Sequence, residues 1–306
     1  MKAEPDELCF ELHFGCDLAE ADVLARLQEV LSRVAPRIAA TLEVHAYERD
    51  PARRRVDLSE PDGLRAAVLA KGAERGATFQ ALAHGQENRL RKLRFGHVTL
   101  RGRGGGTKGV YLKVDFDRRV PAIPSGTNWL WSNNISGRIL APRVEGVDQQ
   151  EWVCRLIDEV ATATTMVWGA AYLSPEFARS NIDTSRGIRA IGRDMRRSLP
   201  GVYWLNVFGP PYIDLIGERR LLDAPADAVK RRGEHIVIST YGNAEDWEAH
   251  DKTRYMLATA LGAEYFFDRD DRARQHQAPD FGLPELPERP PFRVQTEDGI
   301  HFTPLQ

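Results

Sequence analysis

The chain has 306 residues, of which 42% are hydrophobic and 28% are charged, and its formal net charge is −2. This is the composition of a globular protein that can bury a substantial core, and the near-neutral charge argues against a general affinity for nucleic acid. The three cysteines, Cys9, Cys16 and Cys154, are too few for a disulfide scaffold or a zinc site, so we expect small buried side chains.

No targeting signal is visible. Residues 1–7 are polar and acidic, and no apolar segment of a secretory signal follows them. The longest mostly apolar stretch, 160–173, is interrupted by threonines and is too short to cross a bilayer. We therefore expect a cytoplasmic protein that does not contact a membrane.

The first part of the chain reads as strand, helix and strand, followed by two further strands. Alternating apolar residues predict strands at 9–14, 42–46, 95–100 and 110–116. A helix after the capping residue Asp17 is indicated by apolar residues at helical spacing, namely Leu24, Leu27, Leu31 and Val34.

The connection at 101–109 is rich in glycine. A P-loop needs Gly, four residues and then Gly-Lys-Ser/Thr before a helix, whereas Gly-Thr-Lys at 106–108 has another order and a strand follows. A hairpin connection explains the glycines, and binding of phosphate or nucleic acid through Arg101, Arg103 and Lys108 is the weaker alternative.

The middle of the chain combines a loop, a helix and a strand. The segment at 121–137, with its Pro, Gly, Asn and Ser residues, predicts an irregular loop that carries Trp129 and Trp131. Asp148 is placed to cap a helix with an apolar face, and a β-rich run follows at 166–173.

The later part of the chain begins with a basic stretch at 185–199. Its apolar residues recur at helical spacing, which predicts a helix with a solvated face formed by Arg189, Arg193, Arg196 and Arg197. Further on, the pattern predicts a strand at 202–208, a short helix after Pro211, a strand at 236–238, a helix from Asp251 to Gly262 and a strand at 265–267.

These elements predict an α+β fold with a mixed or antiparallel sheet, or sheets, and helices packed on one face. We expect one globular domain over 1–268. Two similar β-α-β sub-lobes, 1–120 and 121–268, remain an open alternative, because strand, helix and strand follow one another twice. The proline-rich segment 269–306 is expected to be an extended C-terminal tail, because such a sequence cannot build a core.

The turn at 243–251 carries four acids around one tryptophan. Charged rims around aromatic anchors suit protein recognition, and they suit the inhibition of a basic nuclease. The candidate contacts are Glu245, Asp246, Trp247, Glu248 and Asp251, with Trp129 and Trp131 as second choice. The plainer alternative is a solvated loop in which Trp247 packs inward.

Side chains that could carry out catalysis are scattered. No His-Glu-x-x-His pattern and no Gly-x-Ser-x-Gly elbow occurs. Asp115 and Asp117 share one face of a strand, and together with the acidic turn they could bind a divalent metal. A metal-dependent hydrolase or nuclease is therefore the alternative function. We favour a protein that is not an enzyme and holds no metal and no cofactor.

The most distinctive segment, 199–217, reads Leu-Pro-Gly-Val-Tyr-Trp-Leu-Asn-Val-Phe-Gly-Pro-Pro-Tyr-Ile-Asp-Leu-Ile-Gly. It resembles a signature of the type VI immunity protein family, the cognate antitoxins of type VI or related polymorphic toxins, some of them nucleases. The motif residues, which we take as mainly structural, are Tyr203, Trp204, Asn206, Phe208, Gly209, Pro210, Tyr212 and Gly217.

The resemblance implies an immunity function with no catalytic residues. The implied partner is a cognate toxin whose active site the chain would occlude. Within the motif, alternation predicts that Tyr203, Leu205 and Val207 share one strand face. The opposite face would then carry Trp204, Asn206 and Phe208.

Overall fold

The structure is a computed structural model. It describes residues 7–34 apart from 17 and 19, and residues 133–140, 148–185, 189–271 and 274–281. At 140 and 189 only the backbone is described. It also describes short pieces at 41–46, 54–56, 60, 63–64, 98–104, 110–116, 123–125, 128–130, 292–296 and 299–303, for most of which only the backbone is considered.

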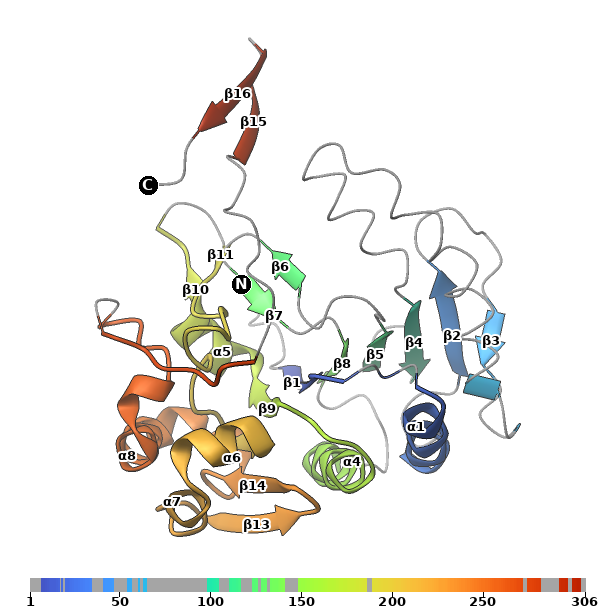
Figure 1. Cartoon of the computed structure of the whole chain (residues 1–306), viewed down its shortest axis with the longest axis horizontal. Helices are drawn as coiled ribbons and strands as arrows, with labels where there is room; N and C mark the ends of the chain where they lie inside the picture. Colours follow the sequence, from blue (N-terminus) through green and yellow to red (C-terminus); the bar gives the residue numbers. More distant parts are fainter. Residues whose placement is uncertain are drawn as a thin grey trace.

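One large sheet organises the chain (Figure 1). Its strands are β1 (Glu7–Phe14), β2 (Thr41–Ala46), β3 (Arg54–Val56), β4 (Val98–Gly104), β5 (Val110–Phe116), β8 (Asn133–Leu140), β9 (Trp168–Leu173), β12 (Leu205–Phe208), β13 (Ala228–Arg232) and β14 (His235–Ser239). They lie in the order β13-β14-β12-β9-β1-β8-β5-β4-β2-β3, and every neighbouring pair is antiparallel.

Three two-stranded pairs stand apart from this sheet. They are β6 (Ile123–Ser125) with β7 (Asn128–Leu130), β10 (Ile182–Asp183) with β11 (Arg189–Ala190), and β15 (Phe292–Thr296) with β16 (Gly299–Thr303). The helices are α1 (Ala21–Val34), α4 (Gln149–Ala163), α5 (Ser174–Asn181), α6 (Pro210–Ile216), α7 (Glu218–Leu222) and α8 (Asp251–Leu261), with the 3-10 helices η3 (Ala244–His250) and η4 (Ala263–Tyr265).

Helices α1 and α4 cover one face of the sheet. The alternating residues Leu8, Phe10, Leu12 and Phe14 of β1 are buried against them in one apolar cluster. The predicted cap is present, because the Asp148 carboxylate accepts hydrogen bonds from the backbone N–H groups of the first turn of α4. Each fully buried leucine or phenylalanine stabilises the fold by about 1.5–3 kcal/mol.

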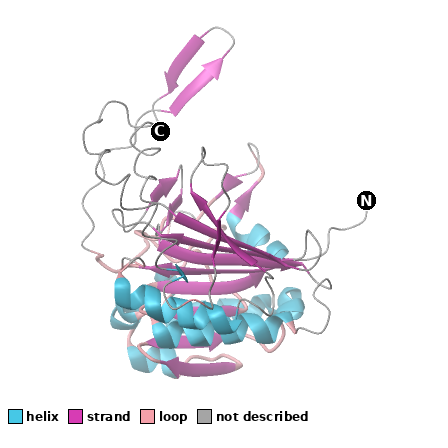
Figure 2. Ribbon diagram, turned by 90° about the vertical axis from the view of Figure 1, so that its right-hand side faces the viewer, coloured by secondary structure: helices cyan, strands magenta, loops and turns pink. Residues whose placement is uncertain are grey.

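A second apolar cluster lies on the opposite face. It contains Trp168 and Tyr172 of β9 and Phe208 of β12, covered by α6 and α8. Figure 2 shows helices on both sides of the stacked strands. The predicted α+β class with an antiparallel sheet is confirmed, but the helices occupy both faces. The reason is that the strands β1, β9, β12 and β14 bury residues of both alternating sets.

Two expected elements are wrong. The segment 121–137 is not irregular throughout, because it contains β6, β7 and the start of β8, a central strand between β1 and β5. The described residues of 185–199 form no helix, and β11 lies among them. The backbone of this segment is held in place by the Asn181 side chain, whose Nδ2 donates hydrogen bonds to the carbonyl oxygens of Ile191 and Pro200.

The end of the chain also differs from its expected form. Residues 265–267 make a single bridge, Leu199 to Phe266, after η4 rather than a strand. The expected extended tail contains the β15–β16 hairpin, and Phe281 lies edge-on to Tyr212 with ring centroids 6.1 Å apart. The large sheet takes strands from both 1–120 and 121–268. The domain boundary at 268 stays a prediction.

Candidate functional site

The acidic turn forms η3, which leads directly into α8. The Asn243 side chain caps it by accepting a hydrogen bond from the Glu245 N–H at 3.0 Å. Glu245, Asp246 and Glu248 are exposed, whereas Trp247 is only 8% exposed. The turn therefore has two layers, with carboxylates at the surface and an indole ring beneath, as the inward-packing alternative expected.

Two arginines from different helices hold Trp247. The guanidinium carbons of Arg179 in α5 and Arg254 in α8 lie 5.9 Å and 5.8 Å from its ring centroid. Arg254 Nη1 also donates to the Trp247 carbonyl oxygen at 2.7 Å. Asp251 forms ion pairs with both arginines. Asp251 thus belongs to the support of η3 and is not a free surface carboxylate.

A buried carboxyl group, Glu176, lies at the base of this arrangement. Its Oε1 accepts hydrogen bonds from the Tyr241 hydroxyl at 2.7 Å and from Arg254 Nη1 at 3.3 Å, and its buried Oε2 has no partner. Burial raises the pKa of Glu176 to about 7, although Tyr241 and Arg254 act in the opposite direction. Tyr241 in turn stacks on His250 with ring centroids 4.6 Å apart. We call Glu176, Tyr241, Trp247, Asp251 and Arg254 the base network.

A second buried carboxyl group, Glu11 of β1, is fully satisfied. It forms an ion pair with Arg193, accepts the Tyr172 hydroxyl at 3.2 Å, and lies 3.0 Å from His13 Nε2. Burial opposes its ionisation, but Arg193 and His13 outweigh burial and hold the pKa of Glu11 at about 2. Arg193 was expected on a solvated face and is instead buried, with its guanidinium carbon 5.1 Å from the Phe177 ring centroid.

Most of the large side chains of the motif at 199–217 are buried. Tyr203, Trp204, Asn206, Phe208 and Tyr212 are all buried. The Asn206 Oδ1 accepts the Tyr203 N–H at 3.0 Å, and its Nδ2 donates to the Tyr203 carbonyl oxygen at 2.8 Å. This loop interrupts the strand, so β12 begins only at Leu205.

The interruption changes the expected alternation. Leu205 and Val207 do lie in one cluster and Phe208 in the other, but Tyr203 belongs with Phe208 and Trp204 with Leu205. The strand faces predicted for Tyr203 and Trp204 are therefore wrong, because both residues precede the regular strand.

The motif's glycines and proline set the turn into α6. A Cβ at Gly209 would lie 1.7 Å from the Met166 carbonyl oxygen, so only glycine fits this close approach. Pro210 begins α6, where its missing N–H is tolerated. Gly217 has a φ of 98°, a backbone conformation that residues with a side chain rarely adopt. It separates α6 from α7.

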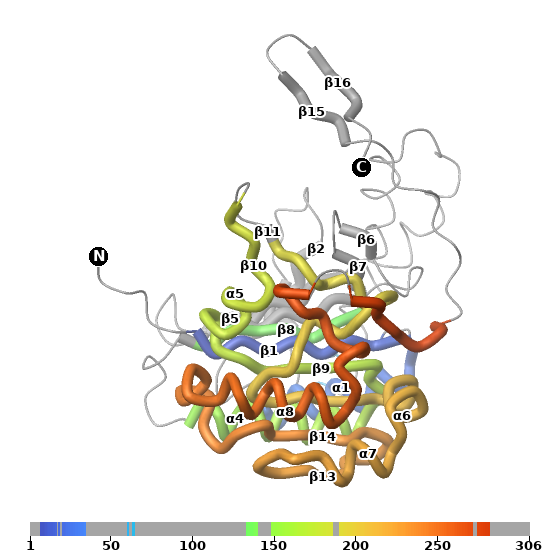
Figure 3. Tube along the Cα trace, turned by 90° about the vertical axis from the view of Figure 1, so that its left-hand side faces the viewer, coloured from blue at the N-terminus to red at the C-terminus, as the bar shows by residue number. Residues whose placement is uncertain are grey.

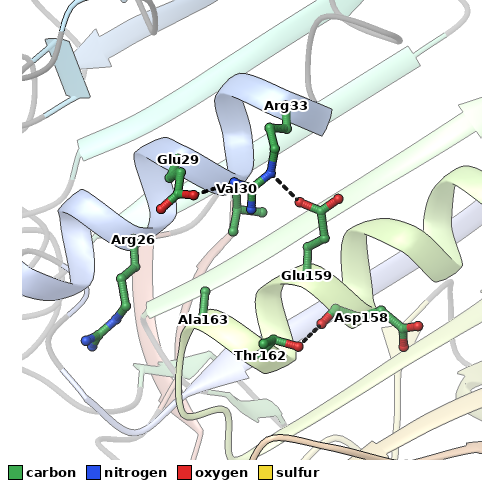
Figure 4. A pocket seen from close by; sticks show the side chains of 8 residues that line it. All are labelled: Arg26, Glu29, Val30, Arg33, Asp158, Glu159, Thr162 and Ala163. Atoms are coloured by element: carbon green, nitrogen blue, oxygen red, sulfur yellow. Dashed lines mark hydrogen bonds and ion pairs between the residues drawn. The ribbon is translucent and has the colours of Figure 1, made fainter.

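A groove of about 400 Å³ lies between α1 and α4 (Figure 4). Its side chains are Arg26, Glu29, Val30, Arg33, Asp158, Glu159, Thr162 and Ala163. Arg33 joins the two helices by donating to Glu159 at 3.0 Å, and it also contacts Glu29. The ion pair of Arg33 with Glu159 crosses the groove, which accounts for these two charges as a helix-packing contact.

The side chains of four further predicted residues are not described. Trp129 in β7 and Asp115 in β5 are placed by their backbone alone, and Trp131 and Asp117 lie outside the described residues. Among the residues that the structure describes, no three His, Cys, Asp or Glu side chains converge as metal ligands, and no helix is long and apolar enough to span a membrane. The metal-dependent alternative stays a prediction.

None of the three cysteines forms a disulfide bond, and all three are partly buried rather than buried as expected. Burial raises the pKa of Cys9 to about 12 and that of Cys154 to about 11. Both thiols are therefore protonated at neutral pH and unreactive as nucleophiles.

Sequence reasoning missed the exposed apolar side chains of α8, the helix that follows the acidic turn. Tyr255 and Met256 of α8 are 69% and 50% exposed. A helical projection could have found them, because they face away from the apolar Leu257 and Leu261. The base network offers no such signal, since Glu176 and Arg254 meet through a side-chain contact between residues 78 positions apart in the chain.

No protein-family model matches the sequence, and no curated protein is detectably similar to it. A solved structure described as a Pseudomonas aeruginosa T6SS protein is similar at 15% identity, with a TM-score of 0.47, over 85% of this chain and 75% of that one. A likeness at this level supports no conclusion about the function of this chain.

Proposed function

We propose that this chain is an immunity-type protein that binds a cognate bacterial toxin and neutralises it, without catalysis of its own. The observation that carries the proposal is the two-layered η3. Three exposed carboxylates, Glu245, Asp246 and Glu248, stand on a base fixed by ion pairs and hydrogen bonds. Within the described part of the chain, none of the three forms an ion pair.

The physics of binding favours such a surface. A preorganised contact loses little conformational entropy when a partner binds, and unpaired carboxylates steer a basic partner toward it. Many toxins that act on nucleic acid are basic where they bind phosphates, so an acidic surface can cover that site. The resemblance of residues 199–217 to type VI immunity proteins supports the same function, although the motif itself is buried.

Neutralisation demands tight binding. A nanomolar complex needs about −12 kcal/mol, and such complexes bury roughly 1,600 Å² in total. Three carboxylates on one turn of 3-10 helix cannot supply that area. The contact must therefore extend from η3 onto its neighbours.

The test is a rescue experiment in bacteria. The wild-type chain is co-expressed with the toxin candidate encoded beside its gene, and growth is measured. We expect rescue by the wild type and loss of rescue by the triple variant E245K/D246K/E248K, with its circular dichroism spectrum and melting temperature almost unchanged. The matched control, E20K/D22K/E29K at α1, reverses as many exposed acids on a distant surface and should rescue.

Two outcomes would count against the proposal. Rescue by the triple variant as efficient as that by the wild type would exclude η3 as the contact. Absence of rescue by the folded wild-type chain would exclude the immunity function itself.

A further inference from the structure

We propose that the exposed face of α8, centred on Tyr255 and Met256, is the apolar anchor of the contact surface, and that it docks into an apolar pocket rimmed by cations on a basic protein. This inference rests on the proposed function and specifies the partner's chemistry. Figure 3 views the molecule from the side on which α8 lies.

Helix α8 is fixed in its rotation by its buried side. Leu257 and Leu261 are fully buried in the second apolar cluster, and Arg254 reaches inward to Glu176. The opposite side must therefore face outward, and it carries Tyr255 at 69% and Met256 at 50% exposure. These two adjacent large side chains are exposed because the helix is anchored, and not because it frays.

The apolar pair follows the acidic residues of η3 closely along the chain. The 3-10 helix passes into α8 at Asp251 without an intervening loop, so Glu248 lies one turn before α8 and Tyr255 lies in its second turn. Two consecutive helices thus carry exposed carboxylates in the first and an exposed aromatic ring and thioether in the second. Interfaces of high affinity have this layout, with an apolar centre and a charged rim.

The side chains themselves indicate the partner. Tyrosine buries a large rigid area at low entropic cost and can place its hydroxyl at a polar edge, and methionine adapts to irregular pockets. The unpaired carboxylates select a positively charged rim. The three carboxylates outnumber Lys252, the one exposed cation of residues 244–261, so this segment as a whole repels the phosphates of nucleic acid and the headgroups of anionic lipid.

A second copy of this chain fits less well than a basic partner. A symmetric contact through the same face would bring Glu245, Asp246 and Glu248 close to their own copies. Like charges at an interface cost free energy. Charge complementarity therefore favours a partner of opposite sign.

The experiment measures affinity for the toxin that the wild-type chain neutralises, by calorimetry or surface plasmon resonance. We expect Tyr255→Ala to weaken binding by at least about 30-fold, as for a central aromatic anchor, and Met256→Ala by about 3–10-fold. The matched control is Leu222→Ala, which truncates another exposed large apolar residue, 42% exposed, on α7. It should change affinity by less than about 2-fold.

Salt dependence separates the apolar anchor from the charged rim. Wild-type affinity should fall as salt rises, because exposed ion pairs are screened. Tyr255→Ala should lower affinity at every salt concentration and leave the salt slope unchanged. The neutral variant E245Q/D246N/E248Q should flatten the slope.

Each failure has a distinct signature. If the wild type binds the toxin and Tyr255→Ala binds equally well, the anchor is refuted while the proposed function stands. If the wild type neutralises no toxin, the proposed function itself is refuted. Self-association in analytical ultracentrifugation that Tyr255→Ala abolishes would show that a second copy occupies the face, and would overturn the inference.

Discussion

Two buried carboxyl groups, Glu11 and Glu176, show how differently one fold can treat the same chemical group. Glu11 has an arginine, a histidine and a tyrosine hydroxyl around it, and its pKa is held at about 2. Glu176 has one oxygen without a partner, and burial raises its pKa to about 7. The two residues are buried to nearly the same depth, with Glu11 5% and Glu176 1% exposed. The hydrogen-bond and ion-pair partners of each carboxyl group therefore decide its ionisation state.

The difference matches the location of the two groups. Glu11 joins the sheet to the segment around Arg193 and is enclosed, so its role is to fix the fold. Glu176 lies beneath the proposed contact surface and connects α5 to α8 through Arg254. An incompletely satisfied buried group is a reservoir of unfavourable energy, and such groups are common at functional sites.

The largest effect on the free energy of unfolding is expected at the buried ion pair of Glu11 with Arg193. Glu11→Gln leaves the buried Arg193 without its counter-charge and should lower the free energy of unfolding by about 3–5 kcal/mol in urea denaturation. The double variant E11Q/R193M removes both charges and should recover part of that loss. A destabilisation below about 1 kcal/mol in the single variant would show that the ion pair is not structurally important.

A smaller effect on the free energy of unfolding is expected at Glu176, where the substitution should stabilise the fold rather than destabilise it. Its folded-state pKa of about 7 lies above the ordinary value of 4.5, so its favourable contribution is fully present below pH 4.5 and is lost as pH rises through 7. At about 1.4 kcal/mol for each pH unit, this interval corresponds to about 3 kcal/mol. Glu176→Gln should therefore be more stable than the wild type at pH 8 and equal to it at pH 4.

Glu11 provides a control in the same series of denaturation measurements, because it ionises in a different pH range. Glu11, with a folded pKa of about 2, contributes stability above pH 4.5 that is lost as pH falls toward 2. Because Glu11 is present in both proteins, the slopes of the two pH profiles should differ only between about pH 4.5 and 7, where Glu176 of the wild type ionises, and the difference in stability should stay constant above that interval. A parallel profile across this interval would refute the assignment.

The smallest effect is expected in the groove between α1 and α4. Arg33 and Glu159 form an ion pair in which Arg33 is 46% exposed. Exposed pairs of this kind contribute about 0–1 kcal/mol. Glu159→Gln should therefore change the free energy of unfolding by less than 1 kcal/mol, and the change should shrink in 0.5 M salt. A loss comparable to that of Glu11→Gln would contradict the distinction between buried and exposed charges.

Much of the fold followed from residue periodicity. Helices α1 and α4, strands β1, β5 and β9, and the turn into α6 were predicted, because each combines a strong apolar pattern with a cap or a breaker. Strand β8 was missed because its sequence, Asn-Asn-Ile-Ser-Gly-Arg-Ile-Leu, is typical of a turn. Its pairing with strands on both sides outweighs that local preference, and the alternation of Ile135 with Ile139 was the available signal.

The site was predictable only at its surface. The carboxylates of η3 were identified from composition, whereas Trp247 was given a contact role although it is buried. The partners that bury it, Arg179 and Arg254, are 68 and seven residues away along the chain. The basic helix expected at 185–199 failed for a similar reason, because Glu11 draws Arg193 into the interior from 182 residues away. Such long-range pairings leave no periodic trace in a sequence.

The central claim is that η3 and α8 together form the contact with a toxin. The most direct measurement is amide hydrogen exchange along the whole chain, with and without the toxin that the chain neutralises. We predict slower exchange across residues 244–260 in the complex and no change across 21–34. Protection confined to other segments, with unchanged exchange in η3 and α8, would contradict the account.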